Sequence, residues 1–324
     1  MLKRRLFAAA VAGAPFAKSA FAQAWAPSGP IHMVVAYPAG GPTDAIARIV
    51  AADMSERLGQ QVIVENQSGA SGAIGTRAVA KAKPDGLTIT FGNNQTHGNN
   101  MFMLKNPGYD AVKDFAPLAG AGAFEHVFVV RNDLPAQNIQ DVIKLAKEKP
   151  GALNYGSTGI GSGSHLSTEL FMARTGIKMT HVPYRGAAPL VTDIIGGRID
   201  ISNSTLPSVL AQITAGKMRA LAIGSAKRNP KLPSVPTLEE QGVTGANAAS
   251  WAGFFAPAAT PEPILQRLSD EILTSLKKPD VVEKIGKLGF TVEPRGPAQF
   301  RPYQVQEIET WVKIAKDAGI QPEE

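Results

Sequence analysis

The 324-residue sequence has no cysteine and only five histidines, and both scarcities narrow its chemistry. Without cysteine there can be no disulfide, thiolate metal site, iron–sulfur cluster or cysteine nucleophile. The histidines form no i, i+3 or i, i+4 pair and no H-E-x-x-H motif, which argues against a helical zinc site. We therefore expect neither a metal nor a cofactor.

Long apolar runs, internal repeats and low-complexity linkers are also missing. Since no run reaches about 20 apolar residues, the sequence does not predict a multi-span membrane protein. A composition of 44% hydrophobic and 19% charged residues is typical of a globular protein with ample core material. At roughly 150 residues per domain, the length predicts about two domains.

The first 22 residues have the pattern of a secretory signal peptide. Lys3, Arg4 and Arg5 precede a short apolar stretch at residues 6–16, and Ala20-Phe21-Ala22 forms an A-x-A cleavage site. We expect cleavage after Ala22 and export to the periplasm. The adjacent arginines leave open whether the general or the twin-arginine route is used.

The apparent basic character of the chain belongs largely to this signal. Residues 1–22 hold four basic residues and no acid, so their removal lowers the formal net charge from +6 to +2. A basic stripe with interleaved aromatic residues, as nucleic-acid binding requires, is absent from the remainder. We therefore expect no nucleic-acid partner, and a fold held together by its core alone.

Apolar runs alternate with helical patterns along the mature chain. We expect strands at residues 31–37, 61–65, 87–91, 127–131 and 221–223. Helices are expected from Thr43 to a stop at Gly59, at 139–148, within 184–195, at 263–276 and at 298–318. This alternation predicts an α/β protein with parallel sheets covered on both faces, and ligands beyond the carboxyl ends of strands.

The first loop of interest, residues 37–44 (YPAGGPTD), joins a strand to a helix. Gly40 and Gly41 allow unusual backbone angles, and the free N–H groups and dipole of the following helix attract anions. Asp44, in the first turn, can accept from a backbone amide. Because its charge would repel a carboxylate, we expect a bridging water or an offset pose. Taken alone, the loop would be better interpreted as an ordinary strand-to-helix turn.

A second loop, residues 155–165 (YGSTGIGSGSH), has four glycines and four hydroxyl residues before a helix expected to start near His165. Amides and hydroxyls at a helix start suit an anionic oxygen group. Ser162 stands where a Walker loop needs lysine, and its neighbours do not make a nucleophile elbow. His165 could act as a base for Ser157 or Ser162, but a packing or ligand-facing histidine is the favoured interpretation.

Further polar side chains follow other expected strands. Arg185 offers a planar fork for a carboxylate, although a solvated arginine at a helix start is nearly as good an interpretation. The run 203–205 (NST) is expected just past a strand, and Asn94 and His97 follow the strand at 87–91. Phe124 and Trp251 could line a cleft but are expected in the core.

These segments, in this order, resemble the Bug family of periplasmic solute-binding proteins, the receptors of tripartite tricarboxylate transporters. The resemblance covers about residues 27–320. Besides 37–44 it rests on 150–165 (PGALNYGSTGIGSGSH), 182–186 (VPYRG), 196–200 (GGRID), 216–222 (GKMRALA), 233–242 (PSVPTLEEQG) and 251–261 (WAGFFAPAATP).

The resemblance implies a two-lobed type II periplasmic-binding-protein fold with a ligand cleft between the lobes. It places one lobe at residues 26–124 plus 226–324 and the other at 125–225. In such proteins the loops matching 38–44 and 157–165 hold one carboxylate, partly through water. The ligand-binding residues that we expect are Ala39, Gly40, Gly41, Thr43, Asp44, Asn94, His97, Ser157, Thr158, Gly161, Ser162, His165, Arg185, Asn203, Ser204 and Thr205.

The sequence departs from the family pattern at two places. Ala39 stands where many members have a second proline, and residues 203–205 (NST) stand where members often have Phe-Asp-Asn. Losing that acid would leave an ammonium group unpaired, at a cost of several kcal/mol. We therefore favour a carboxylic acid without an amine, such as a dicarboxylate, a tricarboxylate or an aromatic acid.

The expected function is that of a monomeric receptor, not an enzyme, which delivers its ligand to the membrane subunits of a tripartite tricarboxylate transporter. One alternative is a ligand-sensing receptor for a signalling partner. A less favoured alternative is a serine hydrolase that uses Ser157 or Ser162 with His165.

Overall fold

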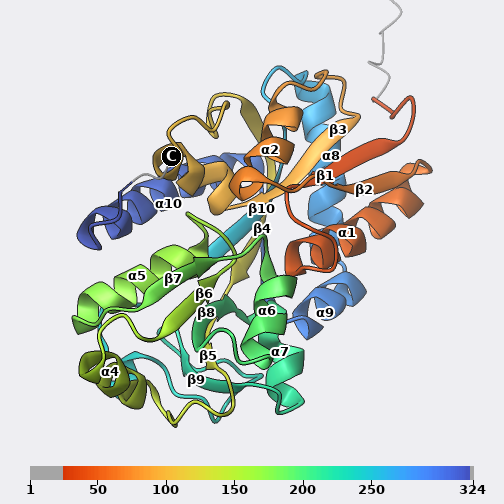
Figure 1. Ribbon diagram of the computed structural model, residues 1–324. Helices are drawn as coiled ribbons and strands as arrows, with labels where there is room; N and C mark the ends of the chain where they lie inside the picture. Colours follow the sequence, from red (N-terminus) through yellow and green to blue (C-terminus); the bar gives the residue numbers. More distant parts are fainter. Residues whose placement is uncertain (1–24, 322–324) are drawn as a thin grey trace, which may run out of the picture.

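The computed structural model of the protein describes residues 25–321, so the predicted signal peptide at residues 1–22 lies outside the described residues. Within residues 25–321, no helix is both long and apolar enough to cross a bilayer. The described chain forms two lobes, each built on its own β-sheet, and Figure 1 shows one lobe above the other.

The six-stranded sheet of the first lobe has the order β11-β4-β10-β3-β1-β2. Its strands are β1 (Ile31–Val35), β2 (Val62–Asn66), β3 (Thr88–Asn93), β4 (Phe115–Phe124), β10 (Ser250–Pro257) and β11 (Phe290–Arg295). β1 pairs in parallel with β2 and β3, as predicted. β10 is antiparallel to β3 and β4, and β11 is antiparallel to β4. The prediction of parallel sheets is wrong for these strands, because they join the sheet without the crossover connection that a parallel pair requires.

The five-stranded sheet of the second lobe has the order β7-β6-β8-β5-β9. Its strands are β5 (His126–Val130), β6 (Asn154–Ser157), β7 (Thr180–Pro183), β8 (Ile201–Thr205) and β9 (Arg219–Ile223). β6 is parallel to β7 and β8, whereas β5 runs antiparallel to β8 and β9. Across both lobes, the sequence predicted five strands, at residues 31–37, 61–65, 87–91, 127–131 and 221–223. All five form, as β1, β2, β3, β5 and β9, with ends within two residues of those predicted.

Helices cover both faces of each sheet, as the alternating pattern predicts. The longer helices are α1 (Pro42–Leu58), α2 (Ala73–Ala80), α4 (Ile139–Glu148), α5 (Gly163–Thr175), α6 (Ala187–Ile195), α7 (Leu206–Thr214), α8 (Glu262–Lys277), α9 (Pro279–Lys287) and α10 (Pro297–Asp317). Short turns are η1 (Ala70–Gly72), η2 (Gln95–Asn99), α3 (Asn100–Met103) and η3 (Glu239–Gln241). Apolar side chains of α1, α8 and α9 form the core on one face of the first sheet, and those of α2 and α10 form the core on the other.

In the second lobe, α4 and α5 pack on one face of the sheet and α6 and α7 on the other. α1 ends at Gly59, whose left-handed φ of 61° is a conformation that glycine adopts without steric cost. This is the stop that the sequence predicts.

Two chain segments and a set of side-chain contacts connect the two lobes. Glu125 alone separates β4 of the first sheet from β5 of the second, and residues 224–249 lead back to the first lobe. The side-chain contacts include one apolar cluster, in which Trp311 and Ala315 of α10 meet Leu166 of α5 and Met103. These connections place the strand ends and helix starts of both lobes opposite one another.

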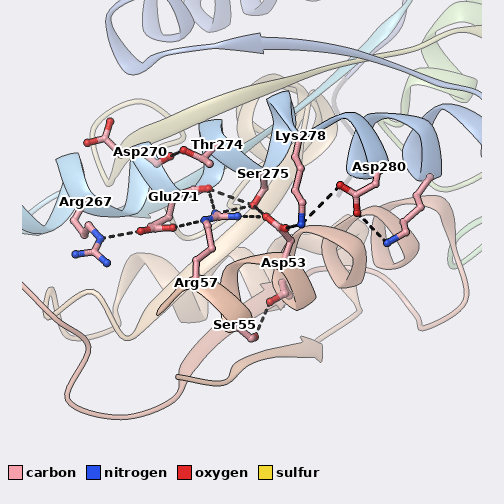
Figure 2. A network of polar contacts seen from close by, with 12 residues as sticks. Asp53, Ser55, Arg57, Arg267, Asp270, Glu271, Thr274, Ser275, Lys278 and Asp280 are labelled. Carbon is pink, nitrogen blue, oxygen red and sulfur yellow. Dashed lines mark hydrogen bonds and ion pairs between the residues drawn. The ribbon is translucent and has the colours of Figure 1, made fainter. Parts of the chain in front are cut away.

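A network of charged groups joins α1 and α8 of the first lobe (Figure 2). Asp53 of α1 forms ion pairs with Arg57 and with Lys278, at 2.8 Å from Lys278 Nζ, and accepts a hydrogen bond from Ser275. Arg57 also pairs with Glu271 of α8. Because Asp53 is buried, each of these donors compensates part of the cost of removing its charge from water.

Candidate functional site

A cavity of about 70 Å³ lies between the lobes, and residues of both lobes line it. At roughly 10–15 Å³ per molecule, this volume accommodates about five to seven waters, so it suits a small ligand. Of the residues predicted from the sequence, those in the lining are Ala39, Gly41, Thr43, Asn94, Thr158, Ser162, Arg185 and Thr205. They come from the ends of β1, β3, β6, β7 and β8, where an α/β fold is expected to bind ligands.

The first helix start at the cavity is that of α1. Gly41 is its N-cap and contributes no side chain, and Pro42 occupies the first helical position. The N–H groups of Thr43 and Asp44 have no hydrogen-bond partner among residues 25–321. Since the first turn of a helix leaves such donors unpaired, this end of α1 presents partial positive charge to the cavity.

Asp44 faces away from the cavity and stabilises the loop from behind. Its carboxylate accepts from the Gly40 N–H at 2.9 Å and pairs with Arg48, and Asn66 donates to it at 3.0 Å. Burial alone would raise the pKa of Asp44, but these hydrogen bonds and the arginine charge lower it. The carboxylate is therefore ionised and neutralised by neighbours, and it does not oppose an anion in the cavity.

The second helix start is that of α5, which begins at Gly163, two residues earlier than predicted. Ser162 is the N-cap, and its hydroxyl accepts from the His165 N–H at 3.2 Å. The Thr158 N–H donates to Ser164 Oγ at 2.9 Å, which ties the loop to the helix. The N–H groups of Gly163 and Ser164 have no partner in the described part of the chain.

The third helix start, that of α6, was not anticipated as an anion site. Gly186 is its N-cap, with a left-handed φ of 103°, and Ala187 and Ala188 line the cavity. Their N–H groups have no partner within residues 25–321, and Pro189 at the next position has no N–H to offer. Three helix starts with unpaired N–H groups thus face one cavity from two lobes, although Ser162 caps one N–H of α5.

The charge of the cavity wall has one sign. Among residues 25–321, Arg185 is the only charged residue of the lining, and no aspartate or glutamate takes part in it. The exposed Arg185 side chain forms no hydrogen bond or ion pair with any described residue. Together with the helix dipoles, this wall favours an anion and opposes a cation.

Several lining residues are not among the ligand-binding residues that the sequence analysis predicted. They are Tyr37, Asn93, Gln95, Phe124, His126, Ser164 and Ser250. Tyr37 Oη hydrogen-bonds to Asn93 Oδ1 at 2.9 Å and Gln95 Oε1 at 2.8 Å, and burial raises the pKa of Tyr37. Most of these residues are ordinary strand residues or strand-end residues, and only their place beside a glycine-rich loop could have indicated them.

The expectation that Phe124 lies in the core is half right. Phe124 is buried with its ring edge-to-face on Phe290, yet it also lines the cavity. Trp251 is buried in the core of the first lobe, with its ring edge-to-face on Phe300. The wall of the cavity is therefore partly apolar.

Half of the predicted site residues lie outside the lining. They are Gly40, Asp44, His97, Ser157, Gly161, His165, Asn203 and Ser204. Asn203 and Ser204 were expected beyond a strand, but β8 continues through Thr205 and buries both. Asn203 donates to Ser167 Oγ at 2.8 Å, and Ser204 hydrogen-bonds to Ser202.

Three of these residues support the second loop from inside the lobe. His165 Nδ1 accepts from the Gly161 N–H at 3.2 Å, and its ring stacks on His181 at 4.2 Å between centroids. Ser157 Oγ hydrogen-bonds to His181 Nε2 at 2.7 Å. Burial lowers the pKa of His165 to about 3 and that of His181 to about 4, so both rings are neutral at pH 7.

This arrangement is not that of a serine hydrolase. Ser162 Oγ contacts Ser164 and the His165 N–H but not an imidazole nitrogen, and His165 Nε2 is 4.0 Å from Glu169. Ser157 does contact a histidine, but it is fully buried and does not reach the cavity. Neither Ser157 nor Ser162 is therefore an accessible nucleophile activated by His165.

His97 is also a structural residue. Its ring is fully buried, stacks on Phe255 at 4.0 Å between centroids and lies edge-to-face on Phe115. Burial lowers its pKa to about 3. Within residues 25–321, no group of three His, Asp or Glu side chains could hold a metal ion.

Comparison with known proteins identifies relatives across nearly the whole chain. The profile of the tripartite tricarboxylate transporter family receptor matches residues 46–320. A UPF0065 protein in the tcbD-tcbE intergenic region of Pseudomonas sp. strain P51 is 39% identical, covering 89% of this chain and 86% of its own length. Protein BugT of Bordetella pertussis is 34% identical, covering 90% of each chain.

Solved structures show the same fold. R. palustris Rpa4515 with adipate is 36% identical with a TM-score of 0.89, covering 92% of this chain and 99% of that one. MatC (Rpa3494) from Rhodopseudomonas palustris with bound malate is 31% identical with a TM-score of 0.85, covering 89% and 99%.

Proposed function

Because this chain belongs to the tripartite tricarboxylate transporter receptor family, we propose that it captures a small carboxylic acid in the cavity between its lobes. Members of this family, which includes Bug proteins, are periplasmic solute-binding proteins and not enzymes. The chain has their two-lobed α/β fold. A serine hydrolase is thereby excluded, in agreement with the contacts of Ser157 and Ser162.

The observation that supports the proposal most strongly is the set of helix starts that present unpaired N–H groups to the cavity. The N–H groups of α1 and α5 approach from opposite lobes, as two halves of one carboxylate site. Thr43, Thr158 and Ser162 add hydroxyl groups around it. Each hydrogen bond to a charged group contributes about 1.5–3 kcal/mol, so a few supply much of the roughly −8 kcal/mol of micromolar binding.

The lining also supports a choice among acids. Relatives of this fold carry adipate and malate, which are dicarboxylates. In this chain the start of α6 and Arg185 provide a second position for a carboxylate, in addition to the one between α1 and α5. Since no acidic residue within 25–321 lines the cavity, an amino acid would leave its ammonium group unpaired. We favour a dicarboxylate without an amine; an aromatic acid or a tricarboxylate remains an alternative.

The proposal extends to the fate of the ligand. The mature chain, after cleavage behind Ala22, would close residues 125–225 onto residues 26–124 plus 226–324, and the closed form would deliver the acid to membrane subunits of the transporter. Because residues of both lobes line the cavity, the ligand contacts all of them only when the two lobes are closed on it. The alternative function is that of a ligand sensor, in which a signalling partner recognises the surface of the closed form.

Substitution of Arg185 tests the second carboxylate position. Isothermal titration with succinate and adipate should show Arg185→Gln weakening binding about tenfold or more, since a charge-assisted contact is lost. Arg198→Gln is the matched control, because that arginine is exposed and pairs with Asp193 away from the cavity. Equal affinity of the Arg185 variant would place the guanidinium outside the site. Absence of binding by any carboxylate to the native protein would refute the proposed function itself.

A further inference from the structure

Ser250 and His126 meet at the floor of the cavity, where the two lobes join. Ser250 begins β10 of the first sheet, and His126 begins β5 of the second. Ser250 Oγ is 2.8 Å from His126 Nε2, and His126 Nδ1 is 3.1 Å from the Asn203 carbonyl oxygen. Both side chains line the cavity although they are 4% and 0% exposed.

The direction of these hydrogen bonds follows from their partners. The carbonyl oxygen of Asn203 can only accept, so the His126 ring carries its proton on Nδ1. Burial lowers the pKa of His126 to about 4, so the ring is neutral at pH 7 and Nε2 has no proton. Ser250 must therefore donate its single hydroxyl proton to Nε2.

Ser250 Oγ is left with lone pairs only, in a wall otherwise rich in donors. A ligand atom beside it must bring a hydrogen of its own, because an oxygen without one would meet lone pairs. A carboxylate oxygen is thus disfavoured at this point, and a hydroxyl is favoured. An ammonium group could also donate, but it would lack an opposite charge among the described lining residues.

The position of Ser250 relative to the start of α5 bears on which ligand atom it would meet. A Cβ placed on Gly163, the first residue of α5, would lie 2.0 Å from Ser250 Oγ and 3.0 Å from His126 Nε2. Ser250 Oγ therefore lies against the helix start that we assign to the carboxylate. For a carboxylate bound at that helix start, the ligand atom beside Ser250 would be a substituent of the adjacent carbon.

We propose that Ser250, oriented by His126, selects acids that carry a hydroxyl on the carbon adjacent to the bound carboxylate. This inference rests on the carboxylate receptor proposed above and narrows its ligand to 2-hydroxy acids. Ser250 is the residue in contact with the ligand, and His126 is a positioning residue.

The test uses matched acids that differ at one carbon, measured by isothermal titration on the mature protein. The pairs are succinate with each malate enantiomer, glutarate with each 2-hydroxyglutarate enantiomer, and propionate with each lactate enantiomer. For at least one pair, a hydroxy acid should bind about five- to tenfold more tightly than its parent, as one net hydrogen bond provides. Oxaloacetate, which places an acceptor at that carbon, should bind more weakly than malate.

Ser250→Ala should reduce the preference for the hydroxyl, measured as the ratio of the affinities within each pair, to within about twofold. Ser269→Ala is the matched control, because it removes another buried serine hydroxyl, bonded to the Leu118 carbonyl away from the cavity. It should retain the native preference. A melting curve of each variant establishes that it is folded.

The outcomes separate this inference from the function on which it rests. Binding of the parent acids with no gain from any hydroxyl overturns the inference alone, as does a preference that survives Ser250→Ala. Tighter binding of aspartate than of malate overturns it as well. The comparison of succinate, malate and oxaloacetate needs only the native protein, so it decides the matter even if the variant fails to fold. If no acid binds at all, both proposals fall.

Discussion

The side-chain amide of Asn94 is buried, and its nitrogen donates no hydrogen bond to any residue within 25–321. The residue is 2% exposed, and it lines the cavity. A buried unpaired donor costs about 1–3 kcal/mol, which an anionic ligand or ordered water can recover. We interpret Asn94 as a donor to the ligand.

The substitution Asn94→Asp tests this interpretation. It preserves shape but replaces a donor with a negative charge, so the affinity for succinate in isothermal titration at pH 7 should fall at least about tenfold. Asn132→Asp, an exposed asparagine that donates to the Gly216 carbonyl, is the control and should bind like the native protein. Unchanged affinity in the Asn94 variant would mean that its amide does not face the ligand.

At the level of single residues, the sequence identified loops better than side chains. Gly41, Thr43 and Ser162 were predicted because free amides and hydroxyls beside glycines are a local signal. Ser250 and His126 carry no such signal, since only the folded sheets bring residues 124 positions apart into contact. Asn203 was placed in a loop because the ends of strands can be predicted only to within a few residues. As a result, it was expected in the wall of the cavity, whereas it is buried within β8.

Gly122 shows how one element depends on a backbone without a side chain. It lies in β4 with a left-handed φ of 143°, and a Cβ there would be 1.9 Å from the Thr291 carbonyl of β11. Gly122→Ala should therefore lower the free energy of unfolding by at least about 2 kcal/mol in urea titrations. Gly286→Ala in α9 is the control: its site has open space, and helix propensity should raise stability by up to about 1 kcal/mol. Equal stabilities would contradict the contact between β4 and β11.

The contact between α1 and α8 depends on Asp53. The hydrogen bonds from Lys278, Ser275 and Arg57 lower its pKa, outweighing the opposing effect of burial. Asp53→Ala removes the shared partner of Arg57, Ser275 and Lys278, while Arg57 keeps Glu271, and the loss should be about 1.5–3 kcal/mol of unfolding free energy. Asp280→Ala removes an exposed acid beside the same Lys278 and should change stability by no more than about 1 kcal/mol. Similar losses from both variants would show that burial of Asp53 is unimportant.

At the level of elements, strands that are apolar on both faces were predictable and glycine-rich ones were not. β1 (IHMVV) and β5 (HVFVV) are continuous β-branched and apolar runs. β4 (FAPLAGAGAF) contains alanine, glycine and proline, which have low strand propensity, yet it is a central strand. Packing against Phe300 and pairing with two neighbours stabilise it, and neither contact is local in sequence.

At the level of the whole molecule, the two-lobed fold was predicted correctly through the family resemblance. Local patterns alone predicted helices and parallel strands, but not where α10 packs. Its apolar stripe showed that it must pack on something, whereas its contact with Leu166 of α5 bridges two lobes. Such a contact depends on the relative placement of the sheets, about which periodicity carries no information.

Acid should weaken the whole fold through its buried histidines. Burial lowers the pKa of His97 and His165 to about 3 and that of His126 to about 4, whereas the unfolded value is about 6.5. The unfolded chain therefore binds more protons below pH 6.5, so stability is greatest above that value and falls with decreasing pH. Burial raises the pKa of Glu169, which acts in the opposite direction.

Urea titrations at pH 7 and pH 5 measure this effect. Each of these three histidines, and likewise His181, whose pKa burial lowers to about 4, should account for a loss of about 2 kcal/mol of unfolding free energy between these pH values. His97→Phe preserves the stacking on Phe255 but cannot titrate, so its loss should be smaller by one histidine's share. His97 belongs to the first lobe, whereas His126 and His165 belong to the second. A single cooperative unfolding transition that shifts with pH would therefore also show that the lobes unfold together. Two separate transitions would show that each lobe unfolds with its own histidines.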